Sequence, residues 1–382
     1  MSASDVAYLD AAAGTPLHPA ARDALIAALD AYGDPRARHA AGRAARRLVE
    51  RARAQLADAI GAEADEILFA GGAAEANAMA ILGVAHATPG GRIVVGVLEH
   101  PSILDAARAS GLEVVEVDCD EHGRVDVDRF AAEVARPRTL IASVGHASHA
   151  LGAMQPLAEC ASIARAHGVL THADACQTLP SLPVDVRALG VDLLTVSANT
   201  AYGPPGVAAL FVRRGLAVDP LLHAGGPSAR GPESNVPGIA AMGAAVEALT
   251  PEVPELAGRL WRLSARLRRG LEEAGILVIG HATQRVPQIV TWAVEDVDDE
   301  TLLMTLEDRG ILAGLVEAAP LARVGLASRG AAVVRMSLHR ETTEANIDRV
   351  LDRVPDAVRS LREMAVRAGS ARREPGRRPP KD

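Results

Sequence analysis

Residues 157–177 read LAECASIARAHGVLTHADACQ, a helix-like stretch followed at once by a short apolar run that ends near Asp174. The spacing of apolar residues predicts a helix over 157–168 and a strand over 169–175. A helix of this length beside a short apolar strand is typical of βαβ units, whose strands run parallel in one sheet. Asp174 would then lie at the carboxyl end of a parallel strand, where open α/β sheets bind ligands.

The same alternation of helices and strands continues along most of the chain. It runs from about residue 43 to residue 350 and indicates a mostly parallel sheet, followed after Pro237 by a smaller second αβ region. The expected strands are 67–70, 92–97, 114–118, 139–145, 193–197, 207–214, 286–294 and 332–338. The other expected helices are 47–60, 75–87, 100–111, 130–135, 237–249, 255–274, 301–310 and 342–365.

Composition limits the classes of function. Hydrophobic residues make up 49% of the 382 residues but aromatic residues only 2%, so Ala, Val, Leu and Ile must fill the core, as in buried parallel strands. The net charge of −8 gives no electrostatic reason to expect a nucleic-acid partner, and no apolar run is long enough to predict a membrane span. Three cysteines are too few for a disulfide framework, and the N-terminus lacks a signal-peptide pattern. We therefore expect a cytoplasmic protein.

Polar residues at strand ends are the first candidates for chemistry. The turn 71–75 precedes a helix, whose first N–H groups favour an anion such as phosphate, although a glycine-rich turn can be purely structural. Alternation places His172, Asp174 and Cys176 on one face of their strand. Asp174 could hold a protonated ring nitrogen, or it could cap a helix or form a salt bridge. A structural metal would need about four ligands, and no other cluster supplies the rest, so we expect no metal.

Two further side chains have more than one possible role. His100 could stack on a planar ligand or could begin the helix that follows it. Arg335 lies in an apolar strand, and a guanidinium there requires a carboxylate, which either the protein or a substrate could provide.

Together these segments resemble the cysteine desulfurase branch of the class V aminotransferases, which are pyridoxal-phosphate (PLP) enzymes of fold type I. The resemblance runs from about Tyr8 to Val354, and the order of the motifs is more specific than any one of them. The matching segments are 8–13, 32–35, the residues His39, Gly42, Arg46 and Glu50, and then 71–77, 100–101, 172–177, 183–186, 202–204, 235–238 and 334–338.

The resemblance implies a fold in several parts. It implies an N-terminal segment 1–14 that packs on the small domain, a large domain 15–250 with a mostly parallel seven-stranded sheet, and a small C-terminal domain 251–366. Residues 367–382 are rich in Pro, Gly and Arg and are expected to be a disordered basic tail. A homodimer is also implied, or a heterodimer with a lysine-bearing relative, in which the segment 223–235 reaches into the neighbouring subunit.

The resemblance also implies roles for individual side chains. His100 would stack on the coenzyme ring, Asp174 would pair with the ring nitrogen, and Gln177 would reach the ring hydroxyl. The turn 71–75 and Ser197 would hold the phosphate, and Arg335 would bind an amino-acid carboxylate. The residues with an implied coenzyme contact are Gly72, Ala73, Ala74, His100, Asp174, Gln177, Ser197 and Asn199.

Two residues that the family needs for its chemistry are missing. Where the family has Ser-Ala-His-Lys, with the lysine that forms the Schiff base, this chain has Asn199 and Thr200, and a hydroxyl cannot form that bond. The only lysine is Lys381, so 39 of the 40 basic residues are arginine. The loop that carries the family's persulfide cysteine corresponds to residues 314–329, which contain no cysteine.

Smaller changes point the same way. The family's Asn-Asn-Glu is replaced by residues 148–150, which include His149, and the threonine of the phosphate turn is replaced by Ala74. Glu233 would bring a negative charge near a phosphate, which disfavours tight coenzyme binding.

Two hypotheses explain these departures. In the first, the chain is a catalytically degenerate accessory or regulatory member that pairs with an active relative or with a sulfur-acceptor protein. In the second, it is a divergent enzyme that binds PLP or pyridoxamine phosphate (PMP) non-covalently and acts on an amino acid or keto acid with His100 or His149 as the base. Cysteine desulfuration by this chain alone is disfavoured, because acid–base help cannot replace both missing groups.

Overall fold

The computed structural model describes residues 6–88, 90–216, 218–219, 235–328 and 330–371. The larger of its two sheets has seven strands in the order β2-β8-β7-β6-β5-β3-β4. Strands β7, β6, β5, β3 and β4 are parallel neighbours, and β8 pairs antiparallel with both β7 and β2. The strands are β2 (Ile67–Ala70), β3 (Arg92–Gly96), β4 (Glu113–Val117), β5 (Thr139–Ser143), β6 (Leu170–Asp174), β7 (Leu193–Ser197) and β8 (Ala208–Val212).

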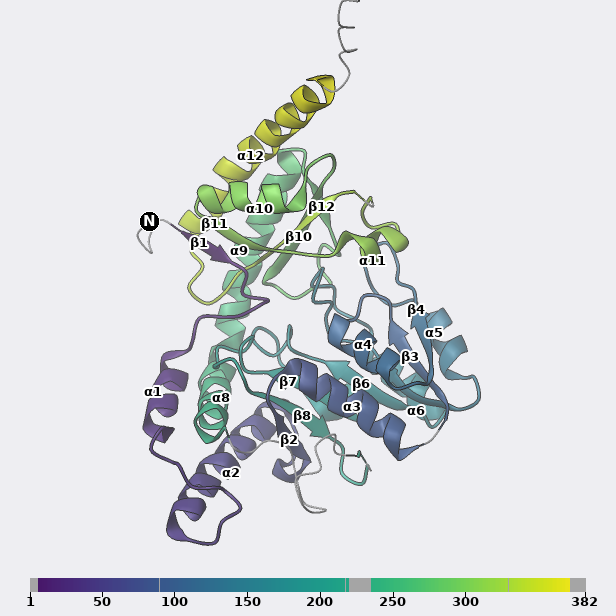
Figure 1. Ribbon diagram of the computed structural model, residues 1–382, viewed down its shortest axis with the longest axis vertical. Helices are drawn as coiled ribbons and strands as arrows, with labels where there is room; N and C mark the ends of the chain where they lie inside the picture. The colour runs from purple at the N-terminus through teal and green to yellow at the C-terminus, as the bar shows by residue number, and fades with distance from the viewer. Residues whose placement is uncertain (1–5, 89, 217, 220–234, 329, 372–382) are drawn as a thin grey trace, which may run out of the picture.

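Helices cover both faces of this sheet, because its central strands are apolar on both sides. One face packs against α2 (Ala40–Ile60), α5 (Val127–Val134), α6 (Leu157–Ala166), α7 (Val186–Leu189) and α8 (Val236–Leu249). The other face packs against α3 (Ala73–Ala87) and α4 (Pro101–Ala109), which lie in front of the sheet in Figure 1. Helix α1 (Pro19–Ala28) lies along α8 at the edge of this layer.

The second sheet has five strands in the order β1-β11-β12-β10-β9. Its first strand comes from the N-terminus and pairs parallel with β11, whereas the other pairs are antiparallel. Helices α9 (Val253–Glu273), α10 (Asp299–Asp308) and α12 (Glu344–Ala371) pack with this sheet in a separate core, in the upper part of Figure 1. Its strands are β1 (Ala7–Leu9), β9 (Leu277–Ile279), β10 (Ile289–Val294), β11 (Ile311–Leu315) and β12 (Ala332–Ser337).

The predicted fold class is confirmed, down to the mostly parallel seven-stranded sheet. The strands β1, β9 and β11 and the helices α1 and α11 (Ala318–Arg323) were not expected from the periodicity, since they are short or lie where the apolar pattern is weak. Helix α12 continues to Ala371, past residue 366, where we expected the tail to begin, and residues 372–382 lie outside the described part of the chain. Among the described residues, no helix combines the length and the apolar character needed to cross a membrane.

Candidate active-site cavity

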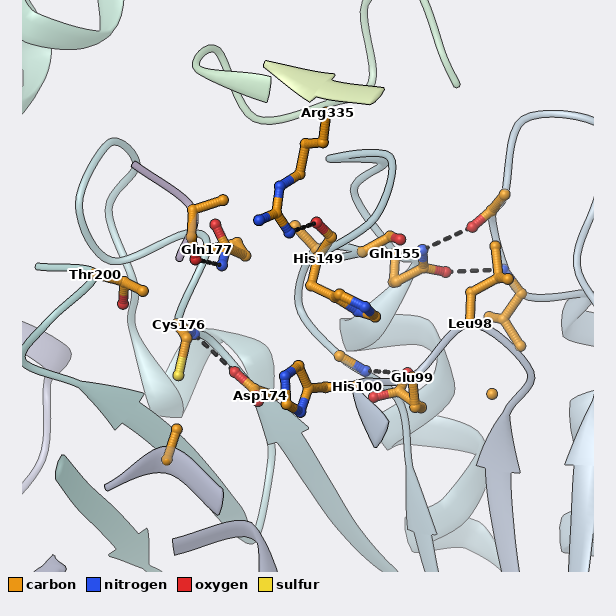
Figure 2. A pocket seen from close by; sticks show the side chains of 18 of the residues that line it. Leu98, Glu99, His100, His149, Gln155, Asp174, Cys176, Gln177, Thr200 and Arg335 are labelled. Carbon is orange, nitrogen blue, oxygen red and sulfur yellow. Dashed lines mark hydrogen bonds between the residues drawn. The ribbon is translucent and has the colours of Figure 1, made fainter. Parts of the chain in front are cut away.

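A cavity of about 260 Å³ opens at the carboxyl ends of the parallel strands β3 to β7. This is the edge at which open α/β sheets bind ligands, and the volume is slightly below the range of roughly 300–1,000 Å³ common for small-molecule sites. Figure 2 shows Asp174 and Thr200 on one side of His100, and Leu98 and Gln155 on the other. The cavity thus extends across several strand ends.

Asp174 is the last residue of β6 and faces the cavity. Its Oδ2 accepts a hydrogen bond from Nδ2 of Asn77 at 2.9 Å, and its Oδ1 accepts one from the backbone N–H of Cys176, also at 2.9 Å. Both donors fix the orientation of the carboxylate. Asn77 comes from α3, so two segments about a hundred residues apart in the chain hold this one side chain in place.

His172, two residues earlier on β6, is fully buried and does not line the cavity. It interacts with Oγ of Ser143 at 2.8 Å and with Oγ1 of Thr195 at 3.1 Å on the two neighbouring strands. Burial lowers the pKa of His172 to about 4, so its ring is neutral at pH 7. Among the described residues no group of three or more His, Cys, Asp or Glu is placed to hold a metal ion.

His100 begins α4 and also lines the cavity. Its Nδ1 accepts the backbone N–H of Ser102 at 3.2 Å, an N-cap interaction, and Pro101 follows at the first helical position. Both roles considered for His100 are therefore compatible. Its ring contacts the ring of His149 edge to face, with the centroids 5.1 Å apart.

His149 is held as a neutral ring. Burial, and to a smaller extent the neighbouring His100 and Arg335, lower the pKa of His149 to about 3. A group with this pKa is a weak base at neutral pH, because efficient general bases have a pKa near the working pH. His149 is therefore a poor candidate for a general base at neutral pH.

Thr200 lies in the turn after β7 and is 6% exposed. Its hydroxyl donates to the backbone carbonyl of Ser197 at 3.3 Å. Oγ of Ser197 donates to Oδ1 of Asn199, whose Nδ2 donates to the carbonyl of Ala13 at 3.0 Å. These three side chains line the cavity, but their polar groups mainly bind one another and the backbone.

Arg335 on β12 reaches the cavity from the five-stranded sheet. Its Nη2 forms an ion pair with Oδ1 of Asp10 at 3.1 Å, and its Nη1 donates to the carbonyl of His149 at 3.0 Å. Its buried Nε has no hydrogen-bond partner among the described residues. The expected carboxylate partner is therefore supplied by the protein itself, and Asp10 was not identified from the sequence as that partner.

The turn 71–75 meets the cavity through Ala73, the first residue of α3, whereas Gly72 and Ala74 are outside its lining. The carboxylate of Glu75 accepts the N–H of Gly71 at 2.7 Å, so this helix start already has one negative group beside it. Gln177 lines the cavity and donates through Nε2 to the carbonyl of Ala12 at 3.0 Å. The segment 220–234, which contains Glu233 and most of the segment expected to reach a partner, lies outside the described residues.

Glu99 is a cavity residue to which the sequence reasoning gave no role. It directly precedes His100, is 9% exposed, and accepts the N–H of Gly145 at 2.7 Å. Burial, opposed in part by this hydrogen bond and reinforced by Asp174, raises the pKa of Glu99 to about 8. Its position just after β3 could have indicated a cavity residue, but its burial depends on how Gly96 and Gly145 pack against it.

Comparison with known proteins identifies the family that has this architecture. The family model for aminotransferase class-V matches residues 7–350. The chain belongs to the class V aminotransferase family. Within the family it is similar to proteins named as cysteine desulfurases, in agreement with the resemblance seen in the sequence.

The relatives match over nearly the whole chain. The cysteine desulfurase IscS of Methanosarcina thermophila is 33% identical, over 94% of this chain and 93% of its own length. The cysteine desulfurase IscS of Anaeromyxobacter dehalogenans is 36% identical, over 94% of both chains. A solved structure of a NifS-like protein superposes with a TM-score of 0.86 at 26% identity, over 93% of this chain and all of that one. The predicted family branch is confirmed.

Proposed function

We propose that this chain is a lysine-less member of the family that binds PLP or PMP without a covalent bond and does not desulfurate cysteine by itself. One observation carries the proposal: Thr200 stands where the resemblance expects the lysine, in a cavity that keeps Asp174 and His100. The hydroxyl of Thr200 donates a hydrogen bond to the backbone carbonyl of Ser197, and Lys381 is the only lysine of the chain. The cavity is open around a carboxylate that two donors orient, which supports binding of a ligand there.

The residues present fit the ring of the coenzyme. A carboxylate held by two donors, as Asp174 is, suits a protonated ring nitrogen, since an opposite charge favours the protonated form. His100 lines the same cavity with a flat ring, and Gln177 brings an amide to its wall. Asp174, His100 and Gln177 are thus the residues that would hold the ring.

The fit at the phosphate end is weaker. The first turn of α3, which begins at Ala73, offers backbone N–H groups, and Ser197 offers a hydroxyl. Glu75 beside this helix start is negatively charged and opposes a phosphate dianion. Without a lysine, binding depends on these contacts alone, so we expect the coenzyme to be held more weakly than by a Schiff base but to survive rapid desalting.

Bound coenzyme would supply an electron sink for bonds at the α-carbon of an amino acid. Asp174 would keep the ring nitrogen protonated, which that chemistry requires. His100 is the candidate for moving a proton at the α-carbon, because the neutral His149 is a weak base and Thr200 offers no amine.

The test is coenzyme retention followed through a desalting column. Purified protein mixed with PLP should show the absorbance of bound coenzyme after rapid desalting, and Asp174→Ala should lose it. Borohydride should attach no pyridoxyl label to the folded body of the protein. The matched gain-of-function control is Thr200→Lys, which should become labelled by borohydride at residue 200. Coenzyme that passes freely through the column, or steady alanine formation from cysteine by the isolated chain, would contradict the proposal.

A second candidate is the accessory or regulatory role, in which the chain pairs with a lysine-bearing relative or a sulfur acceptor. It is supported by an exposed apolar group on and after α1, namely Ile26, Leu29 and Tyr32, which are 59%, 63% and 89% exposed. Large apolar side chains gathered on one surface are typical of protein interfaces. This candidate predicts that a lysine-bearing relative copurifies with the chain and that PLP does not remain with the chain alone.

A further inference from the structure

The cavity extends beyond the residues that would hold a coenzyme ring. One part, the ring lobe, lies at the ends of β6 and β7 around Asp174 and Thr200. The other part, which we call the apolar lobe, lies at the ends of β3 and β4. The apolar lobe is lined by Leu98, Val117, Cys119, Gly123, Val125 and Gln155.

The strongly polar side chain in the wall of the apolar lobe already has its hydrogen-bond partners. Oε1 of Gln155 accepts the N–H of Val125 at 2.8 Å, and its Nε2 donates to the carbonyl of Gly123 at 3.0 Å and to that of Ala153 at 3.2 Å. The amide of Gln155 therefore holds the wall together and is already satisfied. Burial, together with the nearby acidic residues, raises the pKa of Cys119 to about 11, so its thiol is uncharged at neutral pH.

Part of the wall of the apolar lobe packs against the small domain. Leu98 and Cys119 pack against a hydrophobic cluster that contains Leu321 of α11 and Leu326 just after it. Arg323 of α11 pairs with Glu116 of β4, which ties α11 to the large sheet. An apolar wall favours uncharged groups, because a charge placed against it without a partner is unfavourable.

We propose that the apolar lobe is a subsite for the aliphatic side chain of an amino acid or keto acid, such as leucine or its keto acid, whose α-carbon lies toward the ring lobe. This inference rests on the proposed function, since it takes the ring lobe as the place of the coenzyme. The two lobes belong to one cavity, and Figure 2 shows Arg335 and His149 between Gln177 on one side and Gln155 on the other. The substrate carboxylate would then lie near Arg335, with the side chain directed between Leu98 and Val125.

The proposal predicts a dependence on side-chain size. Burial of one methylene is worth ~0.8 kcal/mol, so each added methylene should tighten binding about fourfold until the lobe is full. Keto acids with a charged or strongly polar side chain should bind no better than pyruvate, since the amide of Gln155 is already paired and the other described residues of the lobe offer no charged partner.

The first test measures binding directly in the wild-type protein. The keto acids of alanine, valine, leucine and aspartate are titrated calorimetrically, with and without PMP. Protection of Cys119 from methyl methanethiosulfonate is followed by mass spectrometry of its peptide. The keto acid of leucine should bind most tightly and slow the labelling of Cys119 several-fold, whereas the keto acid of aspartate should not. Equal affinities, or no protection of Cys119, would overturn the proposal.

The second test uses a variant that fills the lobe. Leu98→Trp should abolish the preference for the keto acid of leucine but leave PLP retention in the ring lobe unchanged, and the matched control is Leu277→Trp on the exposed edge strand β9. If Leu98→Trp does not fold, Val125→Ala serves instead, because a larger lobe should shift the optimum to longer chains. If Leu98→Trp folds but the preference for the keto acid of leucine is unchanged, the proposed subsite is contradicted. Failure of the wild type to retain PLP contradicts the proposed function separately, since protection of Cys119 can be measured without coenzyme.

Discussion

At the scale of single residues, the cavity is defined by which polar groups have already found partners. Thr200 donates to its own turn, Asn199 donates to the carbonyl of Ala13, and Arg335 pairs with Asp10. The carboxylate of Asp174 is instead oriented by Asn77 and by the N–H of Cys176. A side chain that is satisfied within the protein contributes little to ligand binding unless the ligand displaces its partner. We therefore expect a ligand in this cavity to depend on Asp174 and His100 more than on the number of polar residues around it.

Glu99 predicts an unusual pH dependence of stability. The pKa of Glu99 rises from its ordinary value of 4.5 to about 8 in the fold, so the folded protein retains a proton that the unfolded chain has released between these pH values. The stability of the wild type should therefore fall as pH rises from about 4.5 to about 8, by several kcal/mol at most, at ~1.4 kcal/mol per unit of pKa.

The variant Glu99→Gln tests this directly, without coenzyme. It keeps the shape of the side chain and the acceptor for Gly145, so it should equal the wild type near pH 4.5 and be more stable above pH 8 in denaturant unfolding. Glu121→Gln, on an exposed turn, is the control and should follow the wild type throughout. Parallel curves for Glu99→Gln and the wild type would contradict the prediction.

Asp10 predicts competition with a substrate carboxylate. Because Asp10 occupies Nη2 of Arg335, a carboxylate ligand must share or displace this pair. Asp10→Asn keeps a hydrogen-bond acceptor but removes the charge, so it should tighten the binding of a keto acid roughly tenfold, the scale of one charge-assisted hydrogen bond. Calorimetric titration measures this, and Arg335→Gln should weaken binding in both backgrounds. Unchanged or weaker binding by Asp10→Asn would show that Arg335 does not meet the ligand.

At the scale of elements, α11 lies in a segment whose observed structure differs from the loop that the resemblance implies. The resemblance assigns residues 314–329 to a mobile loop with a reactive cysteine, but the described residues of this segment include the end of β11 and the helix α11. Leu321 packs in a hydrophobic cluster, and Arg323 pairs with Glu116 and, at 3.6 Å, with Asp118. The segment thus packs against Leu98 and Cys119 in the wall of the apolar lobe and is tied to the large sheet by charge.

Removal of this charge contact should loosen the packing of α11 against Cys119 without unfolding the protein. The side chain of Arg323 is half exposed, so Arg323→Ala should cost about 0–1 kcal/mol of global stability. The local effect should be larger, and labelling of Cys119 by a small thiol reagent should accelerate several-fold. Arg359→Ala, which removes an exposed pair within α12, is the matched control and should leave Cys119 labelling unchanged. A large loss of stability without faster labelling would assign Arg323 a purely structural role.

At the scale of the whole molecule, the two sheets contribute different parts of one site. The seven-stranded sheet supplies Asp174, His100 and Glu99 from strand ends, and the five-stranded sheet supplies Arg335. Strand β1 joins the second sheet, and Asp10, which follows it, binds Arg335. Movement of one sheet relative to the other would therefore change the distance between Arg335 and the ring lobe.

The apolar group on and after α1 predicts association. Ile26→Asp combined with Leu29→Asp should shift the protein to a monomer in light scattering after size-exclusion chromatography, because an interface core does not accept unpaired charges. Leu277→Asp and Met304→Asp change equally exposed apolar residues elsewhere and should leave the mass unchanged. An unaltered dimer in the α1 variant, or a monomeric wild type, would exclude this surface as the self-interface.

Sequence alone determined the features that depend on local order. The alternation of helix-like and strand-like apolar patterns predicted the parallel sheet, because each pattern reflects which face of a segment is buried. The order of the motifs identified the family. The position of Asp174 at a strand end and the absence of a lysine before Lys381 were likewise readable. Short elements such as β9 and α11 could not be predicted, because the spacing of apolar residues shows no reliable repeat over so short a segment.

Tertiary structure decided which side chains meet. Asp10 and Arg335 are 325 residues apart, and no pattern indicates that they pair. The burial of Glu99 and the packing of α11 against Leu98 and Cys119 likewise arise where distant segments pack together. The physical reason is that burial and hydrogen-bond partners are set by close packing between elements, whereas sequence patterns report only which face of each element is buried.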